Sequence, residues 1–505
     1  MPLVAVGVAT TVLLCWFATR RRWWADEIYS VYAMTRPLGD MIKDSATLAE
    51  PIPPGYYLLL RAWNGFLVTV HGLPVPESWL LVPSAVCLGL TVVVTGLAAR
   101  KLVGPGWPTY GVACLCATSL TWALGGLQLR YYPGQFLTGA VVVLLYVHLD
   151  DVRPAFTRRW WALTCALGLA MASCAFMGYS ALFWLCGLFV VDLARVIVFH
   201  HGARRLVPYL AASFFYTPWL AAMGLAIHRY GMGMDITSFW PARPDWPSIW
   251  GVYSEMLVGV PVTVSYVVAV GVIVVAAVAG SRHVRWAWKA SRVERRWVAM
   301  GLSFIVCPAI MVLLVFVYSR YVVPAGSIFV GRYFYVMWPM MCLTIVVAAA
   351  MVWRRLTGRA PIWVTVAVAG VACMAVIYQA GTWTMDMTER KNAVWEPYFE
   401  QAQHLRHAPD VGSSGVAVVS VDIDPLTEGW RYFYVTDQGT SDGFTFLSRD
   451  DPLPDGTEKV YFCAPHGTAT RDFTDVPGFV FDGELTDLKI RIYVTEPPST
   501  GTAGG

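Results

Sequence analysis

The sequence predicts a mainly α-helical, polytopic membrane protein of about eleven transmembrane helices, followed by a small extracytoplasmic α/β domain. Of its 505 residues, 57% are hydrophobic and 14% are charged, and the mean hydropathy is +0.53. Such a composition is typical of chains whose main solvent is lipid. Apolar runs recur until about residue 380, where the composition becomes that of a water-soluble domain. The net charge of +4 does not suggest a nucleic-acid partner.

Each apolar run is close to the roughly 20 residues that a helix needs to cross hydrocarbon. The predicted spans are 2–19, 79–99, 107–127, 134–149, 160–177, 180–199, 206–227, 256–280, 297–318, 334–353 and 361–380. The runs 134–149 and 160–177 are short for a span. The first run lacks a basic start and a small-residue cleavage site, so we expect a retained helix and not a cleaved signal.

Basic residues predict the orientation of these spans. They concentrate in every second connection, at Arg100/Lys101, Arg153/Arg158/Arg159, Arg204/Arg205, 281–296 and Arg354/Arg355/Arg359. The positive-inside rule places these connections and the N-terminus in the cytoplasm of a cell (inner or plasma) membrane. This parity requires that 55–70 does not cross, so we expect an amphipathic helix in the interface. The outer loops are then 20–78, 128–133, 228–255, 319–333 and everything after about 380.

The domain plan that follows is a transmembrane domain at 1–380, an α/β domain at 381–495 and a disordered tail at 496–505. Helical spacing occurs at 394–407, and short strands are predicted at 415–421, 432–435, 459–463, 479–481 and 488–494. This domain is assigned to acceptor binding or to support of a lid, without a choice between them. Its one cysteine, Cys463, cannot form a disulfide within the domain. No Cys/His spacing resembles a zinc site, so structural metal is not expected.

Paired acids, Asp26 and Glu27, follow the first span by a few residues. A carboxylate at the membrane surface can act as general base toward a sugar or lipid hydroxyl. The alternative is that both acids solvate the start of an interfacial helix, with Asp26 as its N-cap. Spacing alone favours this alternative.

Four short motifs, in this order, resemble those of the GT-C glycosyltransferases, closest to the protein O-mannosyltransferase and aminoarabinose-transferase branch. They are WADEIYS at 24–30, PPGYYLLL at 53–60, QLRYY at 128–132 and GRY at 331–333 with Pro339. All four lie on the predicted outer side or at its edge. The chain departs from the family at Ile52, where relatives have His or Lys before the Pro-Pro pair, and at Gln128, where an acid is common. These departures put a second carboxylate and one phosphate ligand in doubt.

The resemblance implies a transferase that moves a sugar from a polyprenyl-phosphate-linked donor to a hydroxyl of a glycan, lipid or protein acceptor. Asp26 is then the catalytic base, and Glu27 either orients it or binds a divalent cation. The leaving phosphate needs cations, and the outer-face candidates are Arg130, Arg332, Lys43, Arg320 and the run Arg20–Arg22. For each arginine the alternative is snorkelling to membrane-lipid headgroups. The aromatic candidates for substrate contact are Tyr56, Tyr57, Tyr131, Tyr132, Tyr333 and Trp240. For Trp240, anchoring in the membrane interface is the default.

Two rival functions remain open. A transporter or flippase usually carries ionisable residues within the bundle or internal repeats. Here Asp192 and His148 lie near predicted helix ends, and no self-similar halves are visible. A non-catalytic GT-C-like subunit is the other rival, favoured by Ile52 and Gln128.

Overall fold

The computed structural model describes residues 2–19, 25–50, 52–71, 75–106, 109–111, 113, 116, 127–152, 156–198, 202–233, 243–256, 260–279, 292–323, 327–356, 404–405, 408, 415–420, 445–448, 452–463, 479–485 and 490–495. The chain divides into two compact units. The first comprises 1–19, 37–59 and 81–385, and the second comprises 20–36, 60–80 and 386–505. Each unit is described separately below.

The first unit is a bundle of long apolar helices. They are α1 (Pro2–Ala18), α6 (Val82–Val103), α9 (Tyr132–Asp150), α10 (Arg158–Met177), α11 (Ser180–Val198), α12 (Val207–Tyr230), α14 (Val260–Ala279), α15 (Arg292–Val317) and α16 (Trp338–Leu356). Among the described residues, seven helices are long and apolar enough to cross a membrane, and 2–18 and 266–278 are shorter apolar helices. The predicted fold class of a polytopic helical membrane protein is therefore confirmed. The predicted span 361–380 and most of 107–127 lie outside the described residues.

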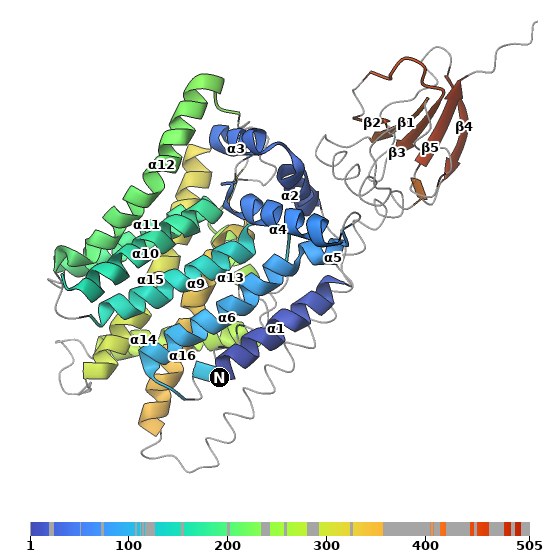
Figure 1. The fold of residues 1–505 in the computed structure, drawn as a ribbon. Helices are drawn as coiled ribbons and strands as arrows, with labels where there is room; N and C mark the ends of the chain where they lie inside the picture. Colours follow the sequence, from blue (N-terminus) through green and yellow to red (C-terminus); the bar gives the residue numbers. More distant parts are fainter. Residues whose placement is uncertain are drawn as a thin grey trace, which may run out of the picture. The chain divides into compact units, whose positions relative to one another are not determined.

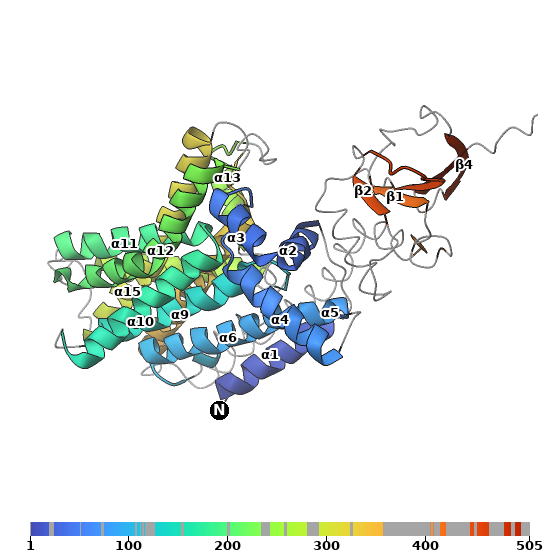
Figure 2. The same ribbon diagram turned by 45° about the horizontal axis from the view of Figure 1, so that its top comes forward.

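The order of packing follows the chain through half of the bundle. Helices α1, α6, α9 and α10 lie side by side in that order, and α12 packs on α10 (Figures 1 and 2). On the other side, α11 packs on α15, α15 on α16 and α16 on α14. Shorter elements complete the unit: α3 (Leu38–Thr47), η1 (Ala203–Leu206), α13 (Ser248–Met256), η4 (Tyr318–Val322) and η5 (Gly331–Met337).

Helix limits in the bundle follow local chemistry, as α6 and α9 show. Proline lies in the first turn of each, where its missing N–H costs no hydrogen bond. Helix α6 ends at Gly104, whose φ of 90° few other residues adopt readily, and Arg100 and Lys101 in its last turn suit the helix dipole. The two runs that looked short form helices of 19 and 20 residues, because polar residues at their ends continue the helix.

The predicted inner connections meet at one end of the bundle. Residues from the ends of α6, α9, α15 and α16 and from η1 contact one another there. The contacts are Lys101–Asp151 (2.8 Å), Arg296–Asp151 (2.6 Å), Arg205–Asp150, and Arg354 over the ring of Trp297 (5.8 Å to its centroid). The parity read from the basic loops is therefore consistent with the packing of the helices.

The segment 55–70 forms a helix, α4 (Gly55–His71). It is not among the described helices with the length and composition of a span, and its place in the membrane interface stays a prediction. Within the second unit, Arg61 of α4 donates hydrogen bonds to the carbonyl oxygens of Met34 (3.0 Å) and Arg36, at the C-terminal end of α2 (Ala25–Thr35). A four-residue helix, α5 (Glu77–Leu80), follows.

The C-terminal part of the second unit contains a five-stranded sheet in the order β2-β1-β3-β5-β4. The strands are β1 (Val416–Ser420), β2 (Thr445–Ser448), β3 (Lys459–Cys463), β4 (Phe479–Leu485) and β5 (Ile490–Thr495). β1 pairs in parallel with β2 and β3, whereas β5 pairs antiparallel with β3 and β4. Val419, Val460, Phe462 and Tyr493 form its buried core. Burial raises the pKa of the Cys463 thiol, so it is an inert core residue.

Four of the five predicted strands are present, and the fifth, at 432–435, lies outside the described residues. Strand β2 was missed because it is only four residues long and follows a segment rich in Gly, Asp and Ser. Of the predicted helix at 394–407, only residues 404 and 405 are described, and both are helical.

Gly178, between α10 and α11, is a point of close approach. Gln135 Nε2 donates a hydrogen bond to its carbonyl oxygen at 2.8 Å. A Cβ at this position would lie 2.5 Å from both that nitrogen and the Tyr131 ring. We expect Gly178→Ala to lower the free energy of unfolding by about 1–3 kcal/mol, the usual cost of overpacking. Thermal denaturation in detergent measures this. Gly224→Ala in α12 is the control, because a Cβ there has nothing within 4 Å. Equal melting temperatures for the two variants would contradict the assigned packing.

Orientation is tested with single cysteines at exposed positions. Gly39 and Arg100 are exposed in the first unit, and Asp455 is exposed in the second. With the predicted topology, an impermeant maleimide added to intact cells should label Gly39→Cys and Asp455→Cys but not Arg100→Cys. The unsubstituted chain gives the background from its own cysteines. Labelling of Arg100→Cys alone would invert the topology.

Candidate active site

The acid pair lies in the first turn of α2. This helix begins at Ala25, so Asp26 is inside the helix and not at the N-cap position that the alternative interpretation gave it. Carboxylates in a first turn are favoured by the helix dipole. Glu27 is fully buried and shares one face of the helix with the buried Ser30, Val31 and Met34, at spacings of three and four residues. Glu27 therefore belongs to the buried face of α2.

The second outer loop, residues 127–131, is almost entirely buried. Leu127 and Leu129 are inaccessible, and Tyr131 is only 4% exposed. Its backbone is held by the Gln128 carbonyl oxygen, which accepts hydrogen bonds from the hydroxyls of Ser84 (2.6 Å) and Tyr56 (3.4 Å). The departure from the family at Gln128 thus occurs at a well-anchored position.

The start of α9 and the 3₁₀ helix η5 interlock through aromatic rings. The Tyr335 ring lies 5.6 Å from Tyr132 and 5.5 Å from Phe136, measured between centroids. Phe334 and Met337 of η5 are fully buried, which fixes the orientation of the short helix. These contacts join two motifs that are far apart in the sequence.

The joined motifs place two arginines around one tyrosine. Burial raises the pKa of the Tyr131 hydroxyl well above its ordinary value, and neighbouring Tyr132 and Tyr333 raise it further. The positive charges of Arg130 and Arg332 act on this pKa in the opposite direction. The Arg332 guanidinium also lies over the Tyr333 ring, 5.9 Å from its centroid. Two cations near one another at the edge of a buried aromatic loop can bind a phosphate group.

Tyr56 and Tyr57 are fully buried and have structural partners. The Tyr56 hydroxyl bonds Ser84 as well as the second outer loop, and the Tyr57 hydroxyl donates to Glu50 Oε1 at 3.0 Å. Both therefore support the loops rather than present open faces to a sugar. Sequence reasoning missed Glu50; the signal for it is an acid shortly before the Pro53–Pro54 pair.

The two remaining cation candidates lie against other partners. Lys43 Nζ lies 4.7 Å from the centroid of the Tyr230 ring, at the end of α12. Arg320 donates to the Pro244 carbonyl oxygen at 3.0 Å. Neither is among the charges that act on Tyr131. Trp240 lies outside the described residues.

Metal binding was considered for Glu27. Among the described residues, no group of three or more His, Cys, Asp or Glu side chains could hold a metal ion. The divalent cation stays a prediction.

Comparison with protein-family models and with curated protein sequences gives no match. Among solved structures, the chain is similar to ArnT from Cupriavidus metallidurans in the apo state, with a TM-score of 0.57, 13% identity and coverage of 98% of this chain and 99% of that one. It is similar to the same protein bound to undecaprenyl phosphate, with a TM-score of 0.56, 12% identity and the same coverage. The chain therefore has, over nearly its whole length, the fold of ArnT, as the resemblance of its outer-loop motifs implied.

Proposed function

We propose that this chain is a membrane glycosyltransferase that moves a sugar from a polyprenyl-phosphate-linked donor to an acceptor hydroxyl on the outer face of the membrane, with inversion. The observation that supports the proposal is the packing of η5 on the start of α9, which brings together the segments that carry Arg332 and Arg130. Undecaprenyl phosphate bound to the structurally similar ArnT supports a lipid phosphate as the donor's leaving group.

The proposed reaction is a single displacement. Asp26 accepts the proton of the acceptor hydroxyl while the oxygen of that hydroxyl attacks the anomeric carbon of the donor sugar. The bond from the anomeric carbon to the phosphate oxygen breaks at the same time. The lipid phosphate leaves with the bonding electrons. A phosphate needs no general acid, only cations to stabilise its charge, which is the role given to Arg130 and Arg332. A β-linked donor gives an α-linked product.

A catalytic chain needs a general base for the acceptor hydroxyl, whereas a non-catalytic subunit does not. Asp26→Asn keeps the shape and polarity of the side chain but removes its basicity. We expect turnover to fall by about a hundredfold or more, the usual range for loss of general-base help, with donor affinity nearly constant. Sugar transfer from a panel of radiolabelled polyprenyl-phosphate sugars in membranes measures this.

Two matched variants serve as controls for the Asp26→Asn result. Glu27→Gln should cost less turnover per folded protein, since Glu27 is buried and acts on α2. Asp40→Asn, in α3 of the same loop, should have little effect. Near-normal transfer by Asp26→Asn with an inactive Glu27→Gln would move the base by one residue, and activity in both would place the base outside this helix.

The phosphate site gives a second test. Arg332→Ala should weaken donor use by about 1.5–3 kcal/mol, the range for a hydrogen bond to a charged group. Arg320→Ala is the matched control, because its guanidinium is bonded to Pro244. The readout is kcat/KM for the donor at fixed acceptor concentration. Unchanged donor kinetics for Arg332→Ala would reassign this arginine to snorkelling.

A further inference from the structure

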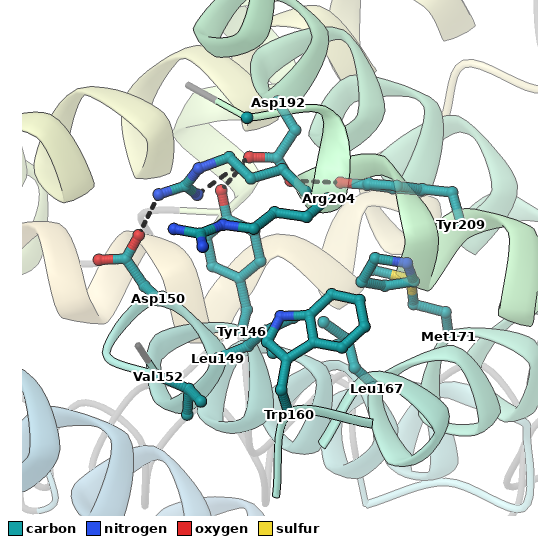
Figure 3. A pocket seen from close by; sticks show the side chains of 13 residues that line it. Tyr146, Leu149, Asp150, Val152, Trp160, Leu167, Met171, Asp192, Arg204 and Tyr209 are labelled. Carbon is teal, nitrogen blue, oxygen red and sulfur yellow. Dashed lines mark hydrogen bonds and ion pairs between the residues drawn. The ribbon is translucent and has the colours of Figure 1, made fainter. Parts of the chain in front are cut away.

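A polar pocket lies at the opposite end of the bundle from the segments 127–131 and 331–337. It lies between the ends of α9 and α11 and the beginnings of α10 and α12, with η1 along one side (Figure 3). Its cavity of about 50 Å³ is several times the roughly 10–15 Å³ that one water molecule needs. That space suits a small polar group such as a phosphate.

The acids at this pocket are already satisfied. Asp192, only 1% exposed, accepts hydrogen bonds from the hydroxyls of Tyr146 (2.7 Å) and Tyr209 (2.9 Å). It also lies 3.6 Å from Arg205 and 3.8 Å from Arg195. Asp150 pairs with Arg205 and, at 3.3 Å, with Arg296. These are the paired buried charges that a low-dielectric interior requires. A transporter site would need a group free to exchange partners.

Four bases at this end have acidic partners. Lys101, Arg195, Arg205 and Arg296 form ion pairs with Asp150, Asp151 and Asp192. Arg204 is a further cation. Its guanidinium lies in the pocket (Figure 3), and among the described residues no hydrogen bond or ion pair to it is found.

The surroundings are those of a membrane interface. Trp160 lines the pocket, and its neighbours Phe156 and Trp161 are 63% and 46% exposed. Their rings contact one another, with centroids 5.0 Å apart for Phe156–Trp160 and 4.8 Å for Trp160–Trp161. Exposed aromatic rings at the end of an apolar helix are typical of the headgroup region. Arg158 and Arg159 occupy the first turn of α10, where the helix dipole disfavours cations and nearby anions would offset the cost.

We propose that this pocket binds the phosphate group of an anionic membrane lipid in the leaflet opposite the proposed active site, with Arg204 as its main contact. A basic pocket between helices on the predicted cytoplasmic side is a recognised form of lipid-headgroup site. The proposal does not depend on the catalytic function.

The test is native mass spectrometry of the detergent-purified full chain, titrated with phosphatidylglycerol and, separately, with zwitterionic phosphatidylcholine. We expect at least about tenfold weaker phosphatidylglycerol binding for Arg204→Gln, the lower range for loss of a charged hydrogen bond. Arg204→Lys should keep part of the affinity, since the charge remains. Arg100→Gln is the matched control, an exposed arginine at the same end that does not line the pocket.

Two results would overturn the proposal. Equal phosphatidylglycerol affinity in Arg204→Gln and Arg100→Gln would show that only the general charge of this face matters. Competition by millimolar inorganic phosphate as strong as that by the lipid would assign the pocket to a soluble anion. Melting temperatures without lipid check that each variant is folded, and Arg204→Lys against the unsubstituted chain still decides the matter if Arg204→Gln does not fold.

Discussion

Hydrocarbon cannot form hydrogen bonds, and this constraint determines where polar and ionisable side chains lie in the bundle. Along the spans, hydroxyls such as Thr91 and Thr344 bond the carbonyl four residues earlier in their own helix. Ionisable groups and long-range polar contacts gather at the two ends. At one end these contacts tie loops to helices, and at the other they form an ion-pair network. Each proposed binding site lies at one of these ends.

At the outer end, hydrogen bonds and aromatic contacts hold the elements that carry two of the motifs. Neutral hydrogen bonds from Tyr56 and Ser84 hold the backbone of the second outer loop, and Gln135 joins it to Gly178. Aromatic packing then fixes η5 against α9. These contacts fix the segments that carry Arg130 and Arg332.

Periodicity and composition predicted most of the fold because spanning helices have a strong, local signal. The limits of α9 and α10 were less accurate, since Tyr132 and Arg158 continue helices that hydropathy alone would end. The site was predicted only in part. The motifs named Arg130 and Arg332 among the cation candidates. The burial of Tyr56 and Tyr57 and their bonds to Ser84 and Glu50 depend on tertiary contacts that a sequence pattern does not encode. Likewise, Lys43 and Arg320 were candidates because they lie in predicted outer loops. Their contacts with Tyr230 and Pro244 could not be predicted from that position in the sequence.

The two ends therefore use arginine in different ways. At the inner end, Arg195, Arg205 and Arg296 form ion pairs with Asp150, Asp151 and Asp192. Their positive charge is therefore largely neutralised by these acids and stabilises helix packing. Arg204, next to Arg205 in the chain, lines the same pocket, but no ion pair to it is found among the described residues. A cation whose only role was to support helix packing would be stabilised more by an acidic partner than by an open cavity. A charge kept in a polar pocket beside exposed aromatic rings is stabilised best by an anion that the membrane itself supplies. Arg204 thus differs in its proposed role from Arg205, because the neighbours of each arginine decide whether its charge is available to a ligand.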